Sequence, residues 1–157
     1  MGYFRVFVDA DSCPRHVREL VARAARRNGF EAVFAANRAV PLGGGADGCA
    51  MVVCGSAKDS ADDYILSVAA ADDIVVTKDI PFAARLVERG ICAMNDRGFV
   101  FTPHNIQDKL MERAFNMNLA KIGLCAKSKK SRYGQAEFER FSRSFSAEVQ
   151  KRAPGGR

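Results

Sequence analysis

A short apolar run that leads into aspartate and then proline constrains this chain more than any other feature. It occurs first at Phe4–Val8, which is followed by Asp9-Ala-Asp-Ser-Cys-Pro14. A run of this kind is typical of a strand that is buried on both faces, as in a parallel sheet. The pattern returns at Ile74–Thr77, which is followed by Lys78-Asp-Ile-Pro81. Both strands are therefore expected to deliver a carboxylate to the same edge of one sheet.

Strands and helices alternate along the chain, which predicts an α/β fold around a mainly parallel sheet of five strands. At 157 residues the chain fits a single domain, residues 1–150, with residues 151–157 as a disordered tail. A short extended piece is expected at Phe99–Phe101. The five expected strands are Phe4–Val8, Ala32–Ala36, Ala50–Cys54, Ile74–Thr77 and Ile91–Met94.

Two helices are expected near the C-terminus. The first should begin with Thr102 as N-cap and Pro103 in the first turn. Its predicted buried stripe consists of Ile106, Leu110, Ala114 and Met117. The second should bury Phe138, Phe141, Phe145 and Val149. The glycine-rich stretch Gly43-Gly-Gly45 is expected to form a surface loop near the site.

Composition excludes several classes of protein. No apolar run approaches the roughly 20 residues that span a bilayer, and no signal peptide is evident. The five cysteines are odd in number and include no C-x-x-C pair, which argues against a disulfide framework and a thiolate zinc site. Cys49, Cys54 and Cys92 are interpreted as small core residues. A reducing cytoplasm is the expected location.

The net charge of +6 is unevenly distributed. Residues 121–157 hold 10 Lys or Arg against 3 Asp or Glu, whereas residues 1–120 hold 14 against 15. A basic segment beside an acidic centre suits a polyanion such as RNA, although Lys127–Arg132 could equally serve solubility. The sequence leaves the oligomeric state open, a homodimer included.

Five aspartates are the candidate catalytic residues, because each follows a strand at the edge where ligands bind in open parallel sheets. Asp9 and Asp11 follow the first strand, Asp59 and Asp62 the third, and Asp79 the fourth. Clustered carboxylates repel one another, and a hard divalent cation such as Mg²⁺ is the usual compensation. Asp9, Asp59, Asp62 and Asp79 are therefore the candidate metal ligands, with Mg²⁺ or Mn²⁺ as cofactor.

Each acid also has a structural interpretation. Asp59 and Asp79 could cap the helices that follow them, and Asp72 with Asp73 is interpreted as a solvated turn. His16 and His104 have no partner at zinc-ligand spacing and are interpreted as surface or capping residues. The candidate substrate-binding residues are Asn37, Ser56, Thr77, Lys78, Arg15 and Arg18.

Three functions remain open. The first is a metal-dependent nuclease that hydrolyses RNA with activated water. The second is a phosphatase of the haloacid dehalogenase type, in which Asp9 is the nucleophile and Asp11 the general acid. The third is a nucleic-acid-binding module without catalysis. A thiol phosphatase is disfavoured, because Glu19 stands where that loop needs arginine after Cys13, and no Gly-x-Ser-x-Gly elbow is present.

The order of motifs resembles the bacterial YaiI/YqxD family across nearly the whole chain. The stretches that carry the resemblance are Val8-Asp-Ala-Asp-Ser-Cys-Pro14, Asp59-Ser-Ala-Asp62, Val76-Thr-Lys-Asp-Ile-Pro-Phe-Ala-Ala84, Asn95-Asp-Arg-Gly98 and Thr102-Pro-His-Asn-Ile106.

That family is grouped with PIN-like domains, so the resemblance implies a three-layer α/β/α fold and a Mg²⁺- or Mn²⁺-dependent ribonuclease. It also implies that Asp9, Asp59 or Asp62, and Asp79 supply the clustered acids, with Asp11 as a possible replacement. Asp63 and Lys78 depart from the family's pattern.

Overall fold

The computed structural model describes residues 4–39, 49–57, 59–124 and 132–152. A six-stranded sheet in the order β3-β2-β1-β4-β5-β6 forms the centre. The strands are β1 (Arg5–Asp9), β2 (Glu31–Ala36), β3 (Cys49–Val53), β4 (Ile74–Val76), β5 (Cys92–Met94) and β6 (Val100–Phe101). All neighbouring strands pair parallel except β5 and β6.

The predicted α/β fold with a mainly parallel sheet is confirmed, with six strands instead of five. The additional strand is β6, the extended piece expected at Phe99–Phe101. It is only two residues long and pairs antiparallel with β5 through a tight turn. Nothing in so short a segment distinguishes a strand from a connecting loop.

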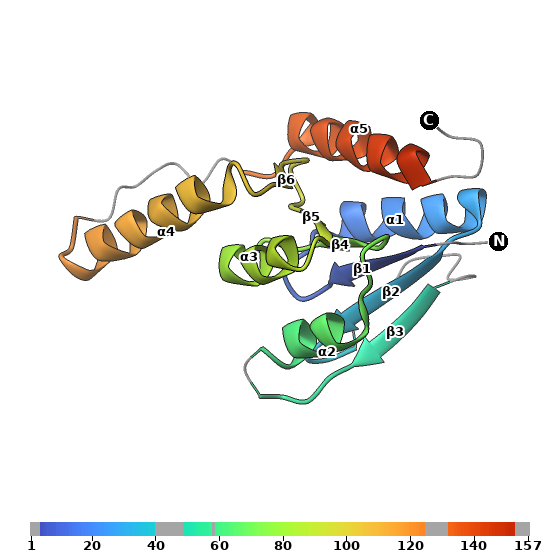
Figure 1. Ribbon diagram of the computed structural model, residues 1–157, viewed down its shortest axis with the longest axis horizontal. Coiled ribbons are helices and arrows are strands. Elements are labelled where there is room, and N and C mark those ends of the chain that lie inside the picture. Colours follow the sequence, from blue (N-terminus) through green and yellow to red (C-terminus); the bar gives the residue numbers. More distant parts are fainter. Residues whose placement is uncertain (1–3, 40–48, 58, 125–131, 153–157) are drawn as a thin grey trace.

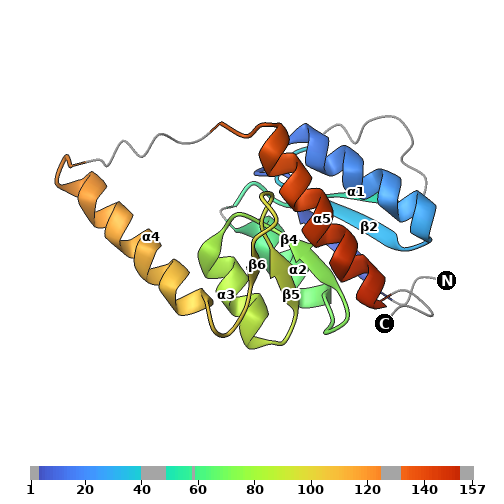
Figure 2. The same ribbon diagram turned by 90° about the horizontal axis from the view of Figure 1, so that it is seen from above.

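The described residues include five helices, α1 (Arg15–Asn28), α2 (Ser60–Val68), α3 (Ile80–Glu88), α4 (Ile106–Lys121) and α5 (Gln135–Arg152). Helices α1 and α5 cover one face of the sheet, α2 and α3 cover the other, and α4 leads away from it (Figures 1 and 2). Alternation along β1 explains the layers, since Val6 and Val8 enter the core beneath α1 and α5, whereas Phe7 enters the core beneath α2 and α3.

Helix α5 lies along α1 and closes one face (Figure 2). Phe141 and Phe145 are fully buried, and their rings stack at a centroid distance of 5.3 Å. The helix continues to Arg152, whose side chain donates a hydrogen bond to the carbonyl of Asp72 at 2.7 Å. Helix α5 therefore includes residues 151 and 152, and residues 153–157 lie outside the described residues.

Helix α4 differs from its prediction in both start and burial. It begins at Ile106, after a turn in which the Thr102 hydroxyl accepts a hydrogen bond from the Asn105 N–H at 3.2 Å. Ile106 is its only buried residue, whereas Ala114 and Met117 are exposed. The predicted stripe is wrong over its second half, because α4 packs beside α3 at its start and then projects away from the body (Figures 1 and 2).

The solvated turn predicted at Asp72 and Asp73 is wrong for Asp73. Asp73 is buried, because its carboxylate accepts hydrogen bonds from the backbone N–H groups of Arg5 at 2.7 Å and Ala70 at 2.8 Å. Among the described cysteines Cys13 is buried, and Cys49, Cys54 and Cys92 are half-buried and pack against the hydrophobic cores, in keeping with their interpretation as small core residues. The loop predicted at Gly43-Gly-Gly45 lies outside the described residues.

Candidate metal centre

The direction in which successive strands are added to the sheet reverses between β1 and β4. From β1 the chain proceeds to β2 and β3 on one side, and β4 and β5 lie on the other. Such a switch point opens a crevice beyond the strand ends. Asp9 ends β1, and Thr77, Lys78 and Asp79 follow β4, so the two repeated sequence patterns meet there.

A cleft of about 580 Å³ occupies this position. Four of the five predicted acids come from the loops and helix that surround it, and the fifth ends the central strand. Its lining residues are Asp9, Asp11, Ser12, Asn37, Asp59, Ala61, Asp62, Lys78, Asp79, Ile80 and Arg113.

Three acids approach most closely. Asp59, Asp62 and Asp79 each offer a carboxylate oxygen within 4.8 Å of the others. Asp59 and Asp62 share a face at the start of α2, as their spacing predicts. Asp59 has a left-handed backbone with φ of 65°, which costs about 1–2 kcal/mol for a residue with a side chain. Its side chain caps no N–H of α2.

Asp79 serves two purposes at once. One carboxylate oxygen accepts a hydrogen bond from the Phe82 N–H at 3.0 Å and caps α3. The capping role predicted for Asp79 is thus confirmed. The same side chain belongs to the group of three acids, so capping and participation in the cluster are compatible.

Asp9, at the end of β1, is buried in the same cleft. It is 9% exposed, and its Oδ2 accepts hydrogen bonds from the hydroxyls of Thr77 at 3.1 Å and Ser12 at 3.4 Å. Burial raises the pKa of Asp9, whereas these two hydrogen bonds lower it and the charges of Asp11 and Asp79 raise it.

Asp62 is the acid whose ionisation is most opposed by its surroundings. It is 7% exposed. Burial, together with the charges of Asp9, Asp79 and Asp59, raises the pKa of Asp62 to about 7. The cleft therefore holds more negative charge than its protein surroundings stabilise at neutral pH. Its oxygen donors are of the kind that Mg²⁺ and Mn²⁺ prefer.

The predicted substrate-binding residues are divided between the cleft and other places. Asn37 and Lys78 line the cleft, and the Asn37 N–H donates to the Asp11 carboxylate at 2.7 Å. Thr77 is buried and orients Asp9. Ser56 is exposed and does not line the cleft.

The structure does not bring Arg15 or Arg18 to the cleft. Arg15 lies on α1 and pairs with Glu19 at 2.9 Å. Arg18 donates to the Cys13 carbonyl at 2.6 Å, and thereby supports the loop that follows β1. Of the predicted basic segment Lys127–Arg132, only Arg132 falls within the described residues, and it is exposed.

Sequence reasoning missed Ser12, Arg113 and Asp96. Ser12 lies in the same tight loop as Asp9, so its proximity could have been inferred. Arg113 reaches the cleft from α4, and no local pattern signals this. Asp96 is buried beside Lys78, where burial raises its pKa and the Lys78 charge opposes that change.

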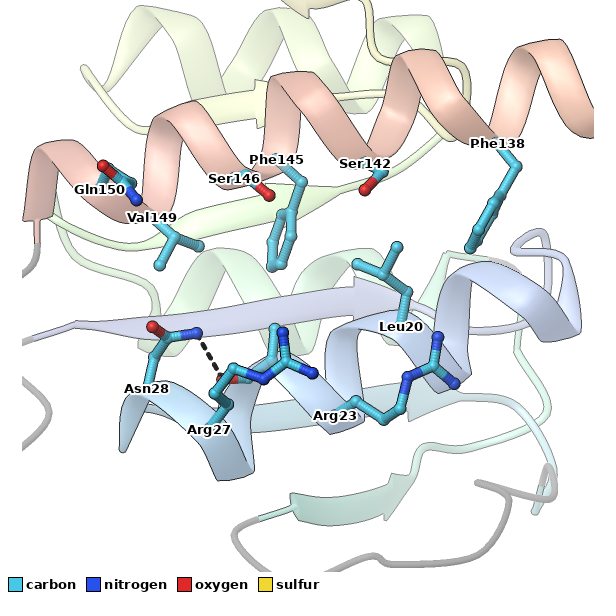
Figure 3. Close-up of a pocket in the computed structure, with 11 residues that line it drawn as sticks. Leu20, Arg23, Arg27, Asn28, Phe138, Ser142, Phe145, Ser146, Val149 and Gln150 are labelled. Carbon is cyan, nitrogen blue, oxygen red and sulfur yellow. Dashed lines mark hydrogen bonds between the residues drawn. The ribbon is translucent and has the colours of Figure 1, made fainter.

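A second cleft, of about 450 Å³, lies between α1 and α5 (Figure 3). Arg23 and Arg27 of α1 lie along one side, and Ser142 and Ser146 of α5 along the other, above Phe145. No carboxylate is among its lining residues in the described part of the chain. Its described lining therefore lacks the carboxylate oxygens that a hard divalent cation prefers, whereas the acidic cleft has them.

None of the helices among the described residues is long and apolar enough to cross a membrane. No solved structure matches the chain.

The family comparison covers most of the chain. A family model described as "Uncharacterized BCR, YaiI/YqxD family" matches residues 7–151. A "UPF0178 protein" of Treponema pallidum (strain Nichols) is 43% identical over 146 residues, which are 93% of this chain and 81% of the relative. One of Treponema denticola is 40% identical over 88% of this chain and 86% of the relative, and one of Syntrophobacter fumaroxidans is 36% identical over 94% and 95%. The match includes the strand ends that carry Asp9 and Asp79, and the chain belongs to the YaiI/YqxD family.

Proposed function

We propose that this protein is a Mg²⁺- or Mn²⁺-dependent hydrolase of phosphodiesters, with RNA as its substrate. The observation that supports this most is the group of Asp59, Asp62 and Asp79, whose oxygens lie within 4.8 Å of one another. They are held at the switch point of a parallel sheet, beside the buried Asp9.

Each residue has a distinct part in the proposal. Asp59, Asp62 and Asp79 would hold the divalent cation, and the Asp9 carboxylate would accept a hydrogen bond or a proton from the attacking water. The cation would polarise the phosphodiester and lower the pKa of the attacking water. Lys78 and Arg113 are the basic residues that line the cleft, and they would bind the phosphate groups on either side of the scissile bond.

RNA is preferred over a small phosphate ester for two reasons. The acidic cleft is open, and basic residues from two different elements line it. The chain also carries a net charge of +6 despite its acidic centre, and positive charge outside a catalytic site attracts a polyanion. We place the protein in the cytoplasm, where its free cysteines stay reduced.

The two other functions inferred from the sequence, a phosphatase and a non-catalytic nucleic-acid-binding module, stay predictions. In the phosphatase scheme Asp11 acts as general acid. Its Oδ2 instead accepts a hydrogen bond from the Asn37 N–H at 2.7 Å, so Asp11 ties the end of β2 to the loop after β1. No described contact of Asp11 favours proton donation to a leaving group. The nuclease hypothesis gives a role to more of the residues that line the cleft than the phosphatase hypothesis does.

Cleavage of a single-stranded RNA in the presence of Mn²⁺ tests the proposal. We expect Asp79→Asn to lower the rate by on the order of 100-fold or more, because it removes a ligand charge. Asparagine remains a good N-cap, so α3 should keep its start. Asp63→Asn is the matched control. Asp63 lies on α2 next to Asp62, but it is exposed and faces Arg85 at 3.8 Å.

Full activity in the Asp79→Asn protein would contradict the assignment. Hydrolysis of a phosphate monoester without RNA cleavage would favour the phosphatase. RNA binding without any Mn²⁺-stimulated cleavage would favour the non-catalytic module.

A further inference from the structure

A third cleft, of about 410 Å³, lies at the β6 edge of the sheet. The turn between β5 and β6 forms its base, and the start of α4 and the first half of α5 flank it (Figures 1 and 2). Four cationic side chains line it, and no carboxylate is among its lining residues in the described ranges. They are Arg97 from the turn, Lys109 from α4, and Arg140 and Arg143 from α5, and we call this cleft the basic pocket.

Three of these cations are held in place by neighbouring side chains. The Glu137 carboxylate accepts a hydrogen bond from Arg140 at 3.2 Å and lies 3.9 Å from the Arg97 guanidinium. The Lys109 ammonium lies over the Phe99 ring, 4.5 Å from its centroid. Side chains that are already oriented lose less conformational freedom when they bind an anion, so the basic pocket is prepared for one.

The positive charge of the basic pocket is only partly balanced. The carboxylates that pair with its cations are Glu137 and Glu112, so four positive charges face two negative ones. Arg143 is exposed and makes no hydrogen bond or ion pair with any residue that the structure describes. A concave surface with such an excess of positive charge attracts anions.

The walls of the basic pocket are fixed by backbone contacts. The Asn95 Oδ1 accepts hydrogen bonds from the N–H groups of Arg97 and Phe99, both at 2.9 Å, which shapes the turn. Gly98 lies so close to α5 that an added Cβ would be 2.5 Å from the Arg140 carbonyl oxygen. The turn and α5 therefore present their three arginines from a rigid frame.

Two observations place the basic pocket next to the acidic cleft. Helix α4 contributes Arg113 to the acidic cleft and Lys109, four residues earlier, to the basic pocket, a rise of about 6 Å along the helix. The buried Asp96 lies near both Lys78 of the acidic cleft and Arg97 of the basic pocket, since both charges lower its pKa against the effect of burial. Cations thus continue from one cleft to the other.

We propose that the basic pocket binds the phosphate backbone of a single RNA strand whose neighbouring segment lies in the acidic cleft. This inference rests on the proposed function, because it takes the same substrate. A cluster of carboxylates repels a polyanion, so affinity for the strand has to come from cations beside the cluster. Contacts to phosphates carry no sequence information, so the basic pocket would hold RNA without regard to its sequence.

Fluorescence anisotropy of a labelled single-stranded RNA, measured in chelator over a range of salt concentrations, tests the proposal. Chelator prevents metal-dependent cleavage, so the result does not depend on the hydrolase. We expect Lys109→Gln/Arg143→Gln to bind more weakly by on the order of 10-fold at about 0.1 M salt. The slope of log Kd against log salt should fall by about 1.4, because two phosphate contacts are lost.

The matched control is Arg23→Gln/Arg27→Gln. It removes the same charge from the cleft between α1 and α5 (Figure 3) and should keep the salt slope of the wild type. Lys109→Arg/Arg143→Lys keeps both charges of the basic pocket and should restore binding, which separates a lost contact from a disturbed fold. In Mn²⁺, Lys109→Gln/Arg143→Gln should raise the KM of RNA cleavage and leave kcat near that of the wild type, because these contacts lie away from the scissile phosphate.

An unchanged salt slope in Lys109→Gln/Arg143→Gln would overturn the proposal. Equal losses in the two glutamine pairs would also overturn it, because binding would then depend on net charge alone. Displacement of the RNA by pyrophosphate at the same phosphate concentration would show a site for small anions and not for a strand. The expected change of slope without any Mn²⁺-stimulated cleavage would support the basic pocket and contradict the hydrolase.

Discussion

At the scale of single residues, Asp62 links the stability of the fold to the charge of the cleft. Its pKa of about 7 means that, between about pH 4 and pH 7, the folded chain binds a proton that the unfolded chain has released. The free energy of unfolding should therefore fall as pH rises through this interval. Asp62, one of the proposed metal ligands, therefore destabilises the metal-free protein when it is ionised.

Asp62→Asn should remove this fall. In a chelator at pH 8 we expect the variant to be more stable than the wild type by about 1–3 kcal/mol, and near pH 4 the two should be alike. Urea unfolding at several pH values measures the difference. Asp63→Asn should retain the slope of the wild type, and superimposable profiles for Asp62→Asn and wild type would contradict the role given to burial.

Thr77 positions Asp9 through its hydroxyl. It donates to Asp9 Oδ2 at 3.1 Å and accepts from the Asp79 N–H at 3.1 Å. Thr77→Val removes the hydrogen bond that lowers the pKa of Asp9 and leaves the Asp79 N–H without its acceptor, at a cost of about 1–3 kcal/mol.

The acid limb of any Mn²⁺-dependent hydrolysis should accordingly shift to higher pH in Thr77→Val, because Asp9 must be ionised. Thr77→Ser keeps the hydroxyl and should keep the wild-type pH profile. The pH dependence of kcat/KM in the three proteins measures this. An unshifted limb in Thr77→Val would show that the hydroxyl does not tune Asp9.

The shared location of Asp9 and Asp79 was predictable from the sequence, because the carboxyl ends of parallel strands lie at the same edge of a sheet. The burial of Asp62, Asp73 and Asp96 was not predictable. Asp73, for example, is buried because its carboxylate accepts from the N–H of Arg5, which lies 68 residues away in the sequence. Partners at such separation leave no local pattern.

At the scale of elements, the turn between β5 and β6 holds α5 at close range. Gly98 has φ of 85°, and a Cβ added there would lie 2.5 Å from the carbonyl oxygen of Arg140. The turn and the helix backbone are therefore in direct contact, and only glycine fits between them.

Gly98→Ala should destabilise the protein by about 3 kcal/mol or more, through both the strained φ and the clash with α5. Gly90→Ala separates the two effects. Gly90 has φ of 75° but nothing within 4 Å of the added Cβ, so its cost should be about 1–2 kcal/mol. Thermal unfolding of both variants gives the comparison, and equal losses would argue against the close approach of α5.

Element prediction succeeded where burial follows periodicity and failed where it does not. The ends of strands β1 to β5 were each predicted to within one residue, because their apolar runs have no other interpretation. Helix α4 was predicted to bury a full stripe, but α3 extends along only its first part. The sequence shows which residues are apolar and does not show how far a neighbouring element reaches.

At the scale of the whole molecule, the sheet order places β1 and β4 next to each other at the centre. Asp9 ends β1, Asp79 follows β4, and Asp59 and Asp62 at the start of α2 line the same cleft. The opposite face carries α1 and α5, whose cleft lacks carboxylates among the described residues. The architecture thus concentrates negative charge at one edge and leaves basic residues around it.

A crystal soaked in Mn²⁺ tests the central claim most directly. We expect one strong anomalous peak among the carboxylate oxygens of Asp59, Asp62 and Asp79, next to Asp9, and no such peak in Asp79→Asn crystals soaked identically. An acidic cleft that stays without anomalous density at Mn²⁺ concentrations that saturate typical Mn²⁺ enzymes would contradict the metal centre and the hydrolase proposed from it.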